Sequence, residues 1–433
     1  MIYWGLLLFF VMEYVRPASY FPALGVLKLN TLVPVLSAIG SLFSGSNRVP
    51  TQQLVSEPQT KLLLSFLGLI VLSVLTADVT DYAWTIFTAV FGYFLVFWVI
   101  AQQVTTLARL KGLIKTLVLV HLAVTALNPQ IFDGAREYIA SGYFLGDGND
   151  FALSVNIVIP LCLFLVLDAA SMRVRLFYIG ALLLLVFDVV ATQSRGGTVA
   201  LGCVGLYFWI KSDRKLAMSV IVTTVLVMVL LVAPAGYFER MNSVADSEEG
   251  SAKGRIEAWT AAVQMAIDHP ILGVGAGHFS VMHGARYRTS VDSPPNQTAH
   301  SIYFLVLGDL GLPGIALFLA VIWANLAANR RLARQLEARD LADTAASRQL
   351  LSSSSASLVA YATGGAFLSA AYYPHLFVIA GLMTAARRVA AARVTTPASA
   401  APRRPVGISP HFVPRQVGHS SPTQVARTRD ALR

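Results

Sequence analysis

Long apolar runs constrain this chain more than any other feature of its sequence. A helix needs about 20 predominantly apolar residues to cross a hydrocarbon layer of about 30 Å, and runs near that length recur from the first residues to beyond position 380. Hydrophobic residues make up 55% of the chain and charged residues 13%, and its mean hydropathy is +0.63. We therefore predict an all-α polytopic membrane protein with about twelve transmembrane helices. The expected spans lie near residues 2–15, 28–43, 61–76, 82–101, 112–128, 150–168, 174–191, 197–211, 216–236, 300–325, 353–369 and 373–387.

Basic residues give the expected orientation of these spans. They cluster in alternate loops, and loops rich in Lys and Arg stay in the cytoplasm. The cytoplasmic set before the C-terminal arginines is Arg48, Lys61, Arg109, Lys111, Lys115, Arg173, Arg175, Lys211, Arg214, Lys215, Arg330, Arg331, Arg334, Arg339 and Arg348. The net charge of +10 and the pI near 9.7 follow from this topology, so they imply no nucleic-acid partner.

The remaining basic residues fall on the other side of the membrane, where the same tendency disfavours them. They are Arg16, Lys28, Arg136, Arg195, Arg240, Lys253, Arg255, Arg286 and Arg288. These residues are the first candidates for function. For Arg288, and also for Arg286, Arg136 and Lys28, sidedness alone suggests contact with a phosphate or with lipid, and simple anchoring at the interface explains them equally well.

We predict a single transmembrane domain over residues 1–393. Residues 394–433 are rich in Pro, Arg, Ser and Thr with few large apolar side chains, which is typical of a disordered tail, here a cytoplasmic one. The two cysteines, Cys162 and Cys203, fall inside expected spans, where neither a structural disulfide nor a metal-thiolate site is expected.

One long hydrophilic loop, residues 237–299, faces away from the cytoplasm in this topology. It holds seven acidic and five basic residues, so it is not a plain polycation for lipid headgroups. Residues 251–268 are expected to form a helix that ends before Pro270, because a residue that precedes proline is disfavoured in a helix. Arg255 and Trp259 would share one face of it, continued by Val263 as an apolar stripe that rests on the membrane surface.

Arg195 lies just after the outer end of the expected span 174–191, in the sequence Thr-Gln-Ser-Arg-Gly-Gly. It is either an arginine that extends to the headgroups or a phosphate ligand, since guanidinium offers a bidentate fork and adjacent glycines permit close approach to the backbone. Asp188 lies seven residues earlier on the same helix face. A buried carboxylate needs a partner, so Asp188 would orient an arginine or bond to a neighbouring helix.

His300 lies where the long loop re-enters the membrane. Histidine titrates near neutrality and can take a proton from a hydroxyl, although a histidine at a helix start is often only a cap or a surface residue. The other loop histidines do not have a metal-site spacing, so no metal is predicted. The glycine run 273–277 lacks the strand that a nucleotide loop follows, and we interpret it as a tight turn.

Further polar groups inside the expected spans are Glu13, His121, Asn156 and Asp309. For these, hydrogen bonds between helices are the expected role.

In type and order these motifs resemble the bacterial O-antigen ligases, with the related O-antigen polymerases and protein O-oligosaccharyltransferases. The resemblance covers about residues 180–325. It rests on Gln193-Ser194-Arg195-Gly196-Gly197, on Arg255 with Trp259, on the run from His269 to Phe279, on Ala299-His300-Ser301-Ile302-Tyr303 and on Gly308-Asp309-Leu310-Gly311-Leu312-Pro313-Gly314. One departure is Asp309, where the family commonly has Glu.

The resemblance implies transfer of a preassembled glycan from an undecaprenyl-diphosphate carrier to a sugar hydroxyl of lipid A–core in lipopolysaccharide biosynthesis. The reaction would take place on the periplasmic face of a Gram-negative inner membrane, without a nucleotide, a metal or another cofactor. His300 would be the base and Arg195 and Arg255 the diphosphate ligands, with Asp188, Trp259, Tyr303 and Asp309 in support.

A single in-line displacement that inverts the anomeric centre is the expected route. The alternatives are a polymerase or a protein O-oligosaccharyltransferase, which use the same chemistry on another acceptor, and a transporter of lipid-linked saccharides. A transporter is disfavoured because its polar groups are expected near the midplane of the membrane and not in a long outer loop.

Overall fold

A computed structural model describes residues 2–43, 48–77, 79–133, 145–232, 248–288, 294–338 and 344–395, all within the compact unit Met1–Thr395. Every regular element in these residues is a helix. The predicted all-α membrane architecture is thereby confirmed. The predicted tail lies outside the described residues from position 396 onward, and so does Arg136.

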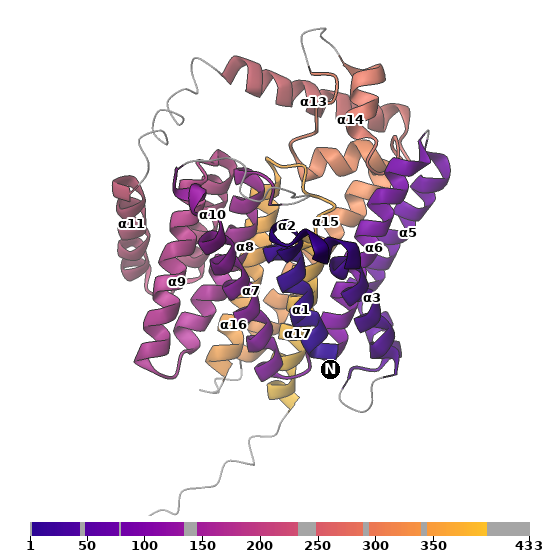
Figure 1. The fold of residues 1–433 in the computed structure, drawn as a ribbon. Helices are drawn as coiled ribbons and strands as arrows, with labels where there is room; N and C mark the ends of the chain where they lie inside the picture. Colours follow the sequence, from indigo (N-terminus) through magenta and orange to yellow (C-terminus); the bar gives the residue numbers. More distant parts are fainter. Residues whose placement is uncertain are drawn as a thin grey trace, which may run out of the picture. The chain divides into compact units, whose positions relative to one another are not determined.

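The helices follow one another along the chain as Figure 1 labels them. The first part of the chain holds α1 (Ile2–Phe10), the π-helix η1 (Val11–Val15), α2 (Pro17–Tyr20), η2 (Pro22–Leu27), α3 (Leu29–Leu42), α4 (Thr51–Ser56), α5 (Pro58–Thr76), α6 (Thr80–Gln103), α7 (Leu107–Leu127) and η3 (Pro129–Asp133). Then come α8 (Gly148–Asp168), α9 (Met172–Ala191), α10 (Arg195–Lys211), α11 (Lys215–Val232), α13 (Glu248–Asp268), α14 (Phe279–Met282), the π-helix η4 (His283–Tyr287), α15 (Ile302–Glu337), α16 (Ala345–Gly365) and α17 (His375–Thr395).

Each of the twelve expected spans overlaps one of these helices. Within the described residues, eight helical segments are long and apolar enough to cross a membrane: η2 with α3, then α5, α6, α7, α8, α9, α15 and α17. Of the remaining four, α1 with η1 and the described start of α11 form shorter apolar segments. The membrane architecture is therefore clear, whereas the number twelve stays a prediction.

The last two expected spans are separate helices, α16 and α17, joined by residues 366–374. α16 is rich in serine, and most of its residues are buried where it packs against α8, α10, α15 and α17. Ser354 and Ser355 are buried and donate to the carbonyl of Leu351 at 3.1 and 2.8 Å. A helix surrounded by protein can keep such hydroxyls, since each finds a partner inside the bundle.

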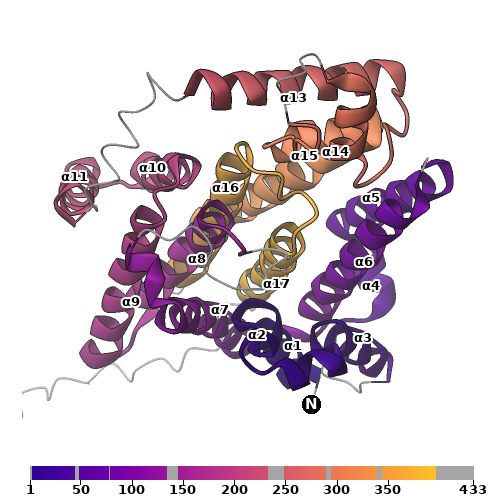
Figure 2. The same cartoon turned by 45° about the horizontal axis from the view of Figure 1, so that its top comes forward.

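The predicted loop helix exists and ends at Asp268, as expected from Pro270. Figures 1 and 2 show α13 running across one end of the bundle, where it packs on α15. Its packed side consists mainly of small residues and Met265, and Trp259 of the predicted stripe stacks on Phe304 of α15. Ile256, Val263 and Ile267 are 61%, 42% and 65% exposed, so the part of the stripe that continues through Val263 does not contact α15 and is available for the membrane surface.

The long loop is hydrogen-bonded to the bundle at a break in α15. Gly311 has φ 65° and ψ −162°, and Pro313 cannot donate a backbone hydrogen bond. The carbonyls of Gly308 and Asp309 instead accept from the amides of Val274 and Gly275, each at 2.9 Å. The glycine run 273–277 is therefore a turn packed against the break, as its sequence predicts.

Gly311→Ala should lower the midpoint of thermal unfolding of the detergent-purified protein. A Cβ at this position would lie 2.6 Å from the carbonyl oxygen of Pro270, and positive φ disfavours any side chain, so we expect a loss of about 1–3 kcal/mol. Gly68→Ala in α5 is the control, since nothing lies within 4 Å of its added methyl group. Equal midpoints for the two variants would show that the break in α15 is not a structural requirement.

Candidate functional site

His300 is held through its backbone by two distant segments. Its amide donates to Ser369 Oγ at 2.8 Å, and the preceding carbonyl, that of Ala299, accepts from Trp259 Nε1 at 3.0 Å. His300 itself has φ 47°, an uncommon conformation for a residue with a side chain that persists only where the surroundings impose it. His300 lies at the surface just before α15 begins at Ile302, although neighbouring groups shield part of its side chain from water.

Trp259 positions α13 over this junction. Its ring stacks on Phe304, with ring centres 5.0 Å apart and planes 12° apart, while its indole N–H makes the hydrogen bond to Ala299. Tyr303, the other aromatic residue predicted to support the site, donates to the carbonyl of Ala362 at 2.8 Å and fastens α15 to α16. Both residues therefore fix the helices around His300.

Arg255 lies one turn before Trp259 on α13 and is half-buried. Burial lowers the pKa of the Arg255 guanidinium, and the positive charge of Arg195 lowers this pKa further. The pKa of His300 is also lowered, first by burial and then by the charge of Arg255, against an opposing effect of Asp147. Like charges repel, so two guanidinium groups whose charges act on each other form a region suited to a bound anion.

Arg195 is the first residue of α10, next to its N-cap. Ser194 Oγ caps the helix by accepting from the amide of Gly197 at 3.1 Å, and Asn156 of α8 donates to the carbonyl of Gly197 at 3.0 Å. A Cβ on Gly197 would come within 2.7 Å of the Ala152 side chain, and one on Gly196 within 3.0 Å of Phe367. Both glycines therefore have a packing role, and close approach of a phosphate to their backbone stays a prediction.

The side-chain hydrogen bond that the structure shows for Asp188 comes from a threonine and not from an arginine. It is fully buried, and its carboxylate accepts from Thr125 Oγ1 of α7 at 2.7 Å. Of the two roles that the sequence left open, the bond to a neighbouring helix is the observed one.

Of the other buried polar groups, Glu13 and His121 join helices, as predicted, whereas Asp309 bonds mainly to a loop turn. Glu13 accepts from Tyr93 at 3.1 Å, and His121 Nε2 lies 2.7 Å from Ser154 Oγ. Asp309 is fully buried and accepts from the amides of Gly277 at 2.9 Å and Phe279 at 2.8 Å. The hydroxyl of Tyr372 donates to the same carboxylate at 3.0 Å, so Asp309 fixes the loop turn to α15.

The remaining basic candidates lie in other surroundings. Arg288 follows η4, where its charge and that of Glu257 act on the buried His283, whose pKa burial lowers. Arg286 is exposed beside Tyr287. Lys28 is an exposed residue with φ 43° at the start of α3. Within the part of the chain that the structure describes, no three His, Cys, Asp or Glu side chains gather as metal ligands.

Sequence reasoning missed the segment 366–374 between α16 and α17. Through Ser369 it holds His300, through Tyr372 it holds Asp309, and the hydroxyl of Tyr373 donates to Asp150 at 3.3 Å. These partners lie at least 63 residues away in the chain. The available signal was the sequence Tyr372-Tyr373-Pro374, at the outer end of the expected span 373–387.

Asp147 was also missed. It caps α8 by accepting from the amides of Asn149 at 2.7 Å and Asp150 at 2.9 Å, and its charge raises the pKa of His300. The Asp-Gly-Asn-Asp sequence before an apolar run is an N-cap signal that could have placed it. An acidic group therefore acts on His300 in addition to the basic Arg255.

Most of these residues lie in a segment that matches a known protein family. Residues 180–319, about a third of the chain, match the family model Wzy_C, described as O-antigen ligase. The matched segment includes Arg195, Arg255, Arg288, His300 and Asp309. No curated protein matches the chain.

Proposed function

We propose that this chain, whose residues 180–319 match the O-antigen ligase family model, transfers a glycan from undecaprenyl diphosphate to a sugar hydroxyl of lipid A–core. The family match supports a membrane enzyme that acts on lipid-linked glycans. The observation that supports the site is the electrostatic coupling of Arg195 to Arg255 and of Arg255 to His300. It supports a site to which three separate segments contribute: Arg195 from α10, Arg255 from α13 and His300 from the segment before α15.

The cationic pair suits a diphosphate leaving group. As the bond between the anomeric carbon and the diphosphate oxygen breaks, its electron pair stays on the diphosphate and negative charge grows there. Arg195 and Arg255 stabilise this charge more strongly in the transition state than in the bound substrate, which is the condition for catalysis. A doubly charged ligand also relieves the repulsion between the two guanidinium groups.

His300 suits the role of general base. A base must be neutral to accept a proton, and the lowered pKa of His300 keeps its imidazole neutral at and somewhat below neutral pH. In the proposed step the imidazole takes the proton of the acceptor hydroxyl while that oxygen bonds to the anomeric carbon. The fixed backbone on both sides of His300 limits the positions of the ring.

The proposed route is a single displacement with inversion and without a metal. Asp147, whose charge acts on His300, already caps α8, and Asp150 in the first turn of α8 accepts from Tyr373. Neither needs to act as a nucleophile in this scheme. Retention of the anomeric configuration in the product linkage would contradict a single displacement.

Asp147→Asn should shift the acid limb of the pH dependence of kcat/KM to lower pH. The Asp147 charge raises the pKa of His300, so its removal lowers that pKa and the base stays neutral in more acidic solution. Asparagine still caps a helix, so α8 should remain intact. The acid limb is measured from pH 5 to 8 with the purified enzyme, and an unchanged or upward-shifted limb would show that this limb does not report His300.

Complementation tests the proposed function and separates it from its relatives. In a Gram-negative strain that lacks its own ligase, expression of this chain should attach long glycan to lipid A–core and produce a lipopolysaccharide ladder on gels. Glycan that is lengthened but stays on the lipid carrier would indicate a polymerase instead. Glycan attached to protein would indicate a protein O-oligosaccharyltransferase, and in either case the proposed acceptor is wrong.

A further inference from the structure

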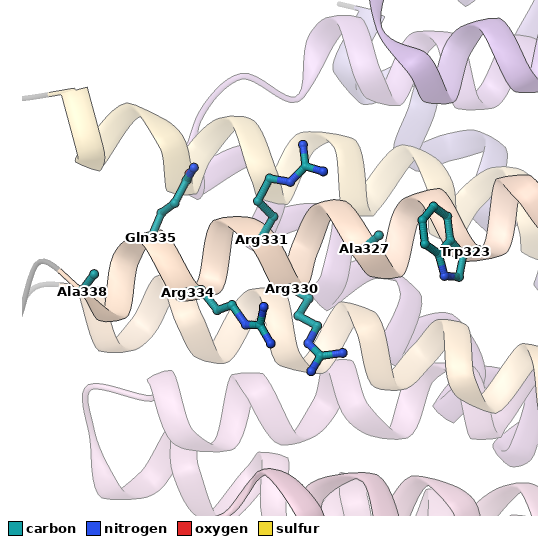
Figure 3. A pocket seen from close by; sticks show the side chains of 7 residues that line it. All are labelled: Trp323, Ala327, Arg330, Arg331, Arg334, Gln335 and Ala338. Carbon is teal, nitrogen blue, oxygen red and sulfur yellow. The ribbon is translucent and has the colours of Figure 1, made fainter.

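The second half of α15 presents an exposed basic surface far from His300. Figure 3 shows an open hollow along this helix that is lined by Trp323, Arg330, Arg331, Arg334 and Gln335, among others. Arg330 lies 28 residues after the first residue of α15, which corresponds to about 42 Å along a helix. That distance is close to the thickness of a bilayer with its headgroups, so these arginines lie at the opposite membrane face from His300.

These three arginines have no carboxylate partner among the described residues, in contrast to other basic residues with expected cytoplasmic positions. Lys111 pairs with Asp168 at 2.6 Å, Arg388 with Glu57 at 2.6 Å and Arg348 with Glu337 at 3.6 Å. Arg330, Arg331 and Arg334 are exposed, and Figure 3 shows Arg330 and Arg334 extending to the same side of the helix. Two guanidinium groups one turn apart, without an internal anion, can bind a phosphate from outside.

The same face of α15 is apolar within the membrane. Leu312, Leu319 and Trp323 are 57%, 46% and 72% exposed. At 100° per residue they fall within about 60° of Arg330 and Arg334 around the helix axis. Leu312 and Trp323 are about 17 Å apart along the helix, close to half the thickness of the hydrocarbon core, and tryptophan is enriched at the boundary with the headgroups.

We propose that this face of α15 binds an anionic phospholipid of the cytoplasmic leaflet. The phosphate lies between Arg330 and Arg334, the glycerol region lies near Trp323, and an acyl chain follows Leu319 toward Leu312. A soluble phosphate would need only the arginines, whereas the exposed apolar residues on the same face call for a ligand with a chain. Such a lipid would stabilise the helix that continues from the break at Gly311.

Lipid titration of the full-length protein in detergent, followed by native mass spectrometry, tests this site. We expect binding of phosphatidylglycerol to exceed that of phosphatidylcholine, and Arg330→Gln with Arg334→Gln to weaken phosphatidylglycerol binding by about tenfold or more, as expected for two charges near a headgroup. The matched control is Arg173→Gln with Arg214→Gln, which removes the same charge from two other exposed residues on the expected cytoplasmic side.

Three outcomes would overturn the proposal. Equal weakening by both double variants would show that net charge, and not this site, sets binding. Competition by glycerophosphoglycerol, which lacks acyl chains, at the same concentration as the lipid would indicate a site for soluble phosphates. Unchanged lipid binding in Arg330→Gln with Arg334→Gln would remove the arginines from the site. Thermal unfolding of each variant confirms that it is folded.

Discussion

His300→Ala should leave a folded, membrane-inserted protein whose transfer rate is lower by about 10²–10⁴-fold, the usual contribution of a general base. The substitution removes the imidazole, while the hydrogen bond to Ser369 and the one from Trp259 to Ala299 involve only backbone atoms of this junction. The fold should therefore survive. Transfer is measured as the rate at which labelled lipid-linked glycan becomes attached to lipid A–core.

His269→Ala is the matched control, because His269 is an exposed histidine of the same loop. We expect it to transfer glycan at the rate of the unchanged protein. A His300→Ala protein with a normal lipopolysaccharide ladder would rule out His300 as the base, and a variant that fails to insert would be replaced by His300→Gln, which keeps a polar side chain of similar length.

Arg195→Lys should reduce transfer by about 10²–10³-fold, as does removal of one donor from an oxyanion site. Lysine keeps the charge at the start of α10 but lacks the planar fork that meets two phosphate oxygens at once. Helix α10 keeps its cap, since Ser194 Oγ and the amide of Gly197 are unaffected. The measurement is kcat and KM for the lipid-linked donor with the purified enzyme.

Lys253→Arg is the control for that substitution, because Lys253 is an exposed basic residue of the outer loop for which no phosphate contact is proposed. It should retain full activity. Full transfer by Arg195→Lys would show that bidentate recognition is not required at this position, and charge alone would then explain the role of Arg195.

The sequence predicted those parts of the fold that depend on local pattern. Apolar runs located the helices, and Pro270 correctly predicted that α13 ends at Asp268. The glycine run was correctly interpreted as a turn, since no strand precedes it. Polar residues inside the spans were correctly expected to bond between helices, as Glu13 and His121 do.

What the sequence did not predict depends on contacts between distant segments. Ser369 reaches His300 only because α16 packs against α8, α10 and α15, which places residues 366–374 beside the site. Packing also explains why Gly197 is small, since Ala152 occupies the space beside it. Periodicity could not show which side of α13 is exposed. Apolar residues lie on more than one side of this helix, and the structure buries its alanines while Ile256 is exposed.

Transfer of glycan by the purified protein is the measurement that tests the proposed reaction. The purified protein is mixed with a defined undecaprenyl-diphosphate-linked glycan and lipid A–core in the presence of EDTA, and the linkage of the product is determined by nuclear magnetic resonance. We expect attachment of glycan to a sugar of lipid A–core with an inverted anomeric centre, at a rate that EDTA does not change. Transfer that EDTA abolishes, or a protein that binds the donor but forms no glycosidic bond, would contradict it.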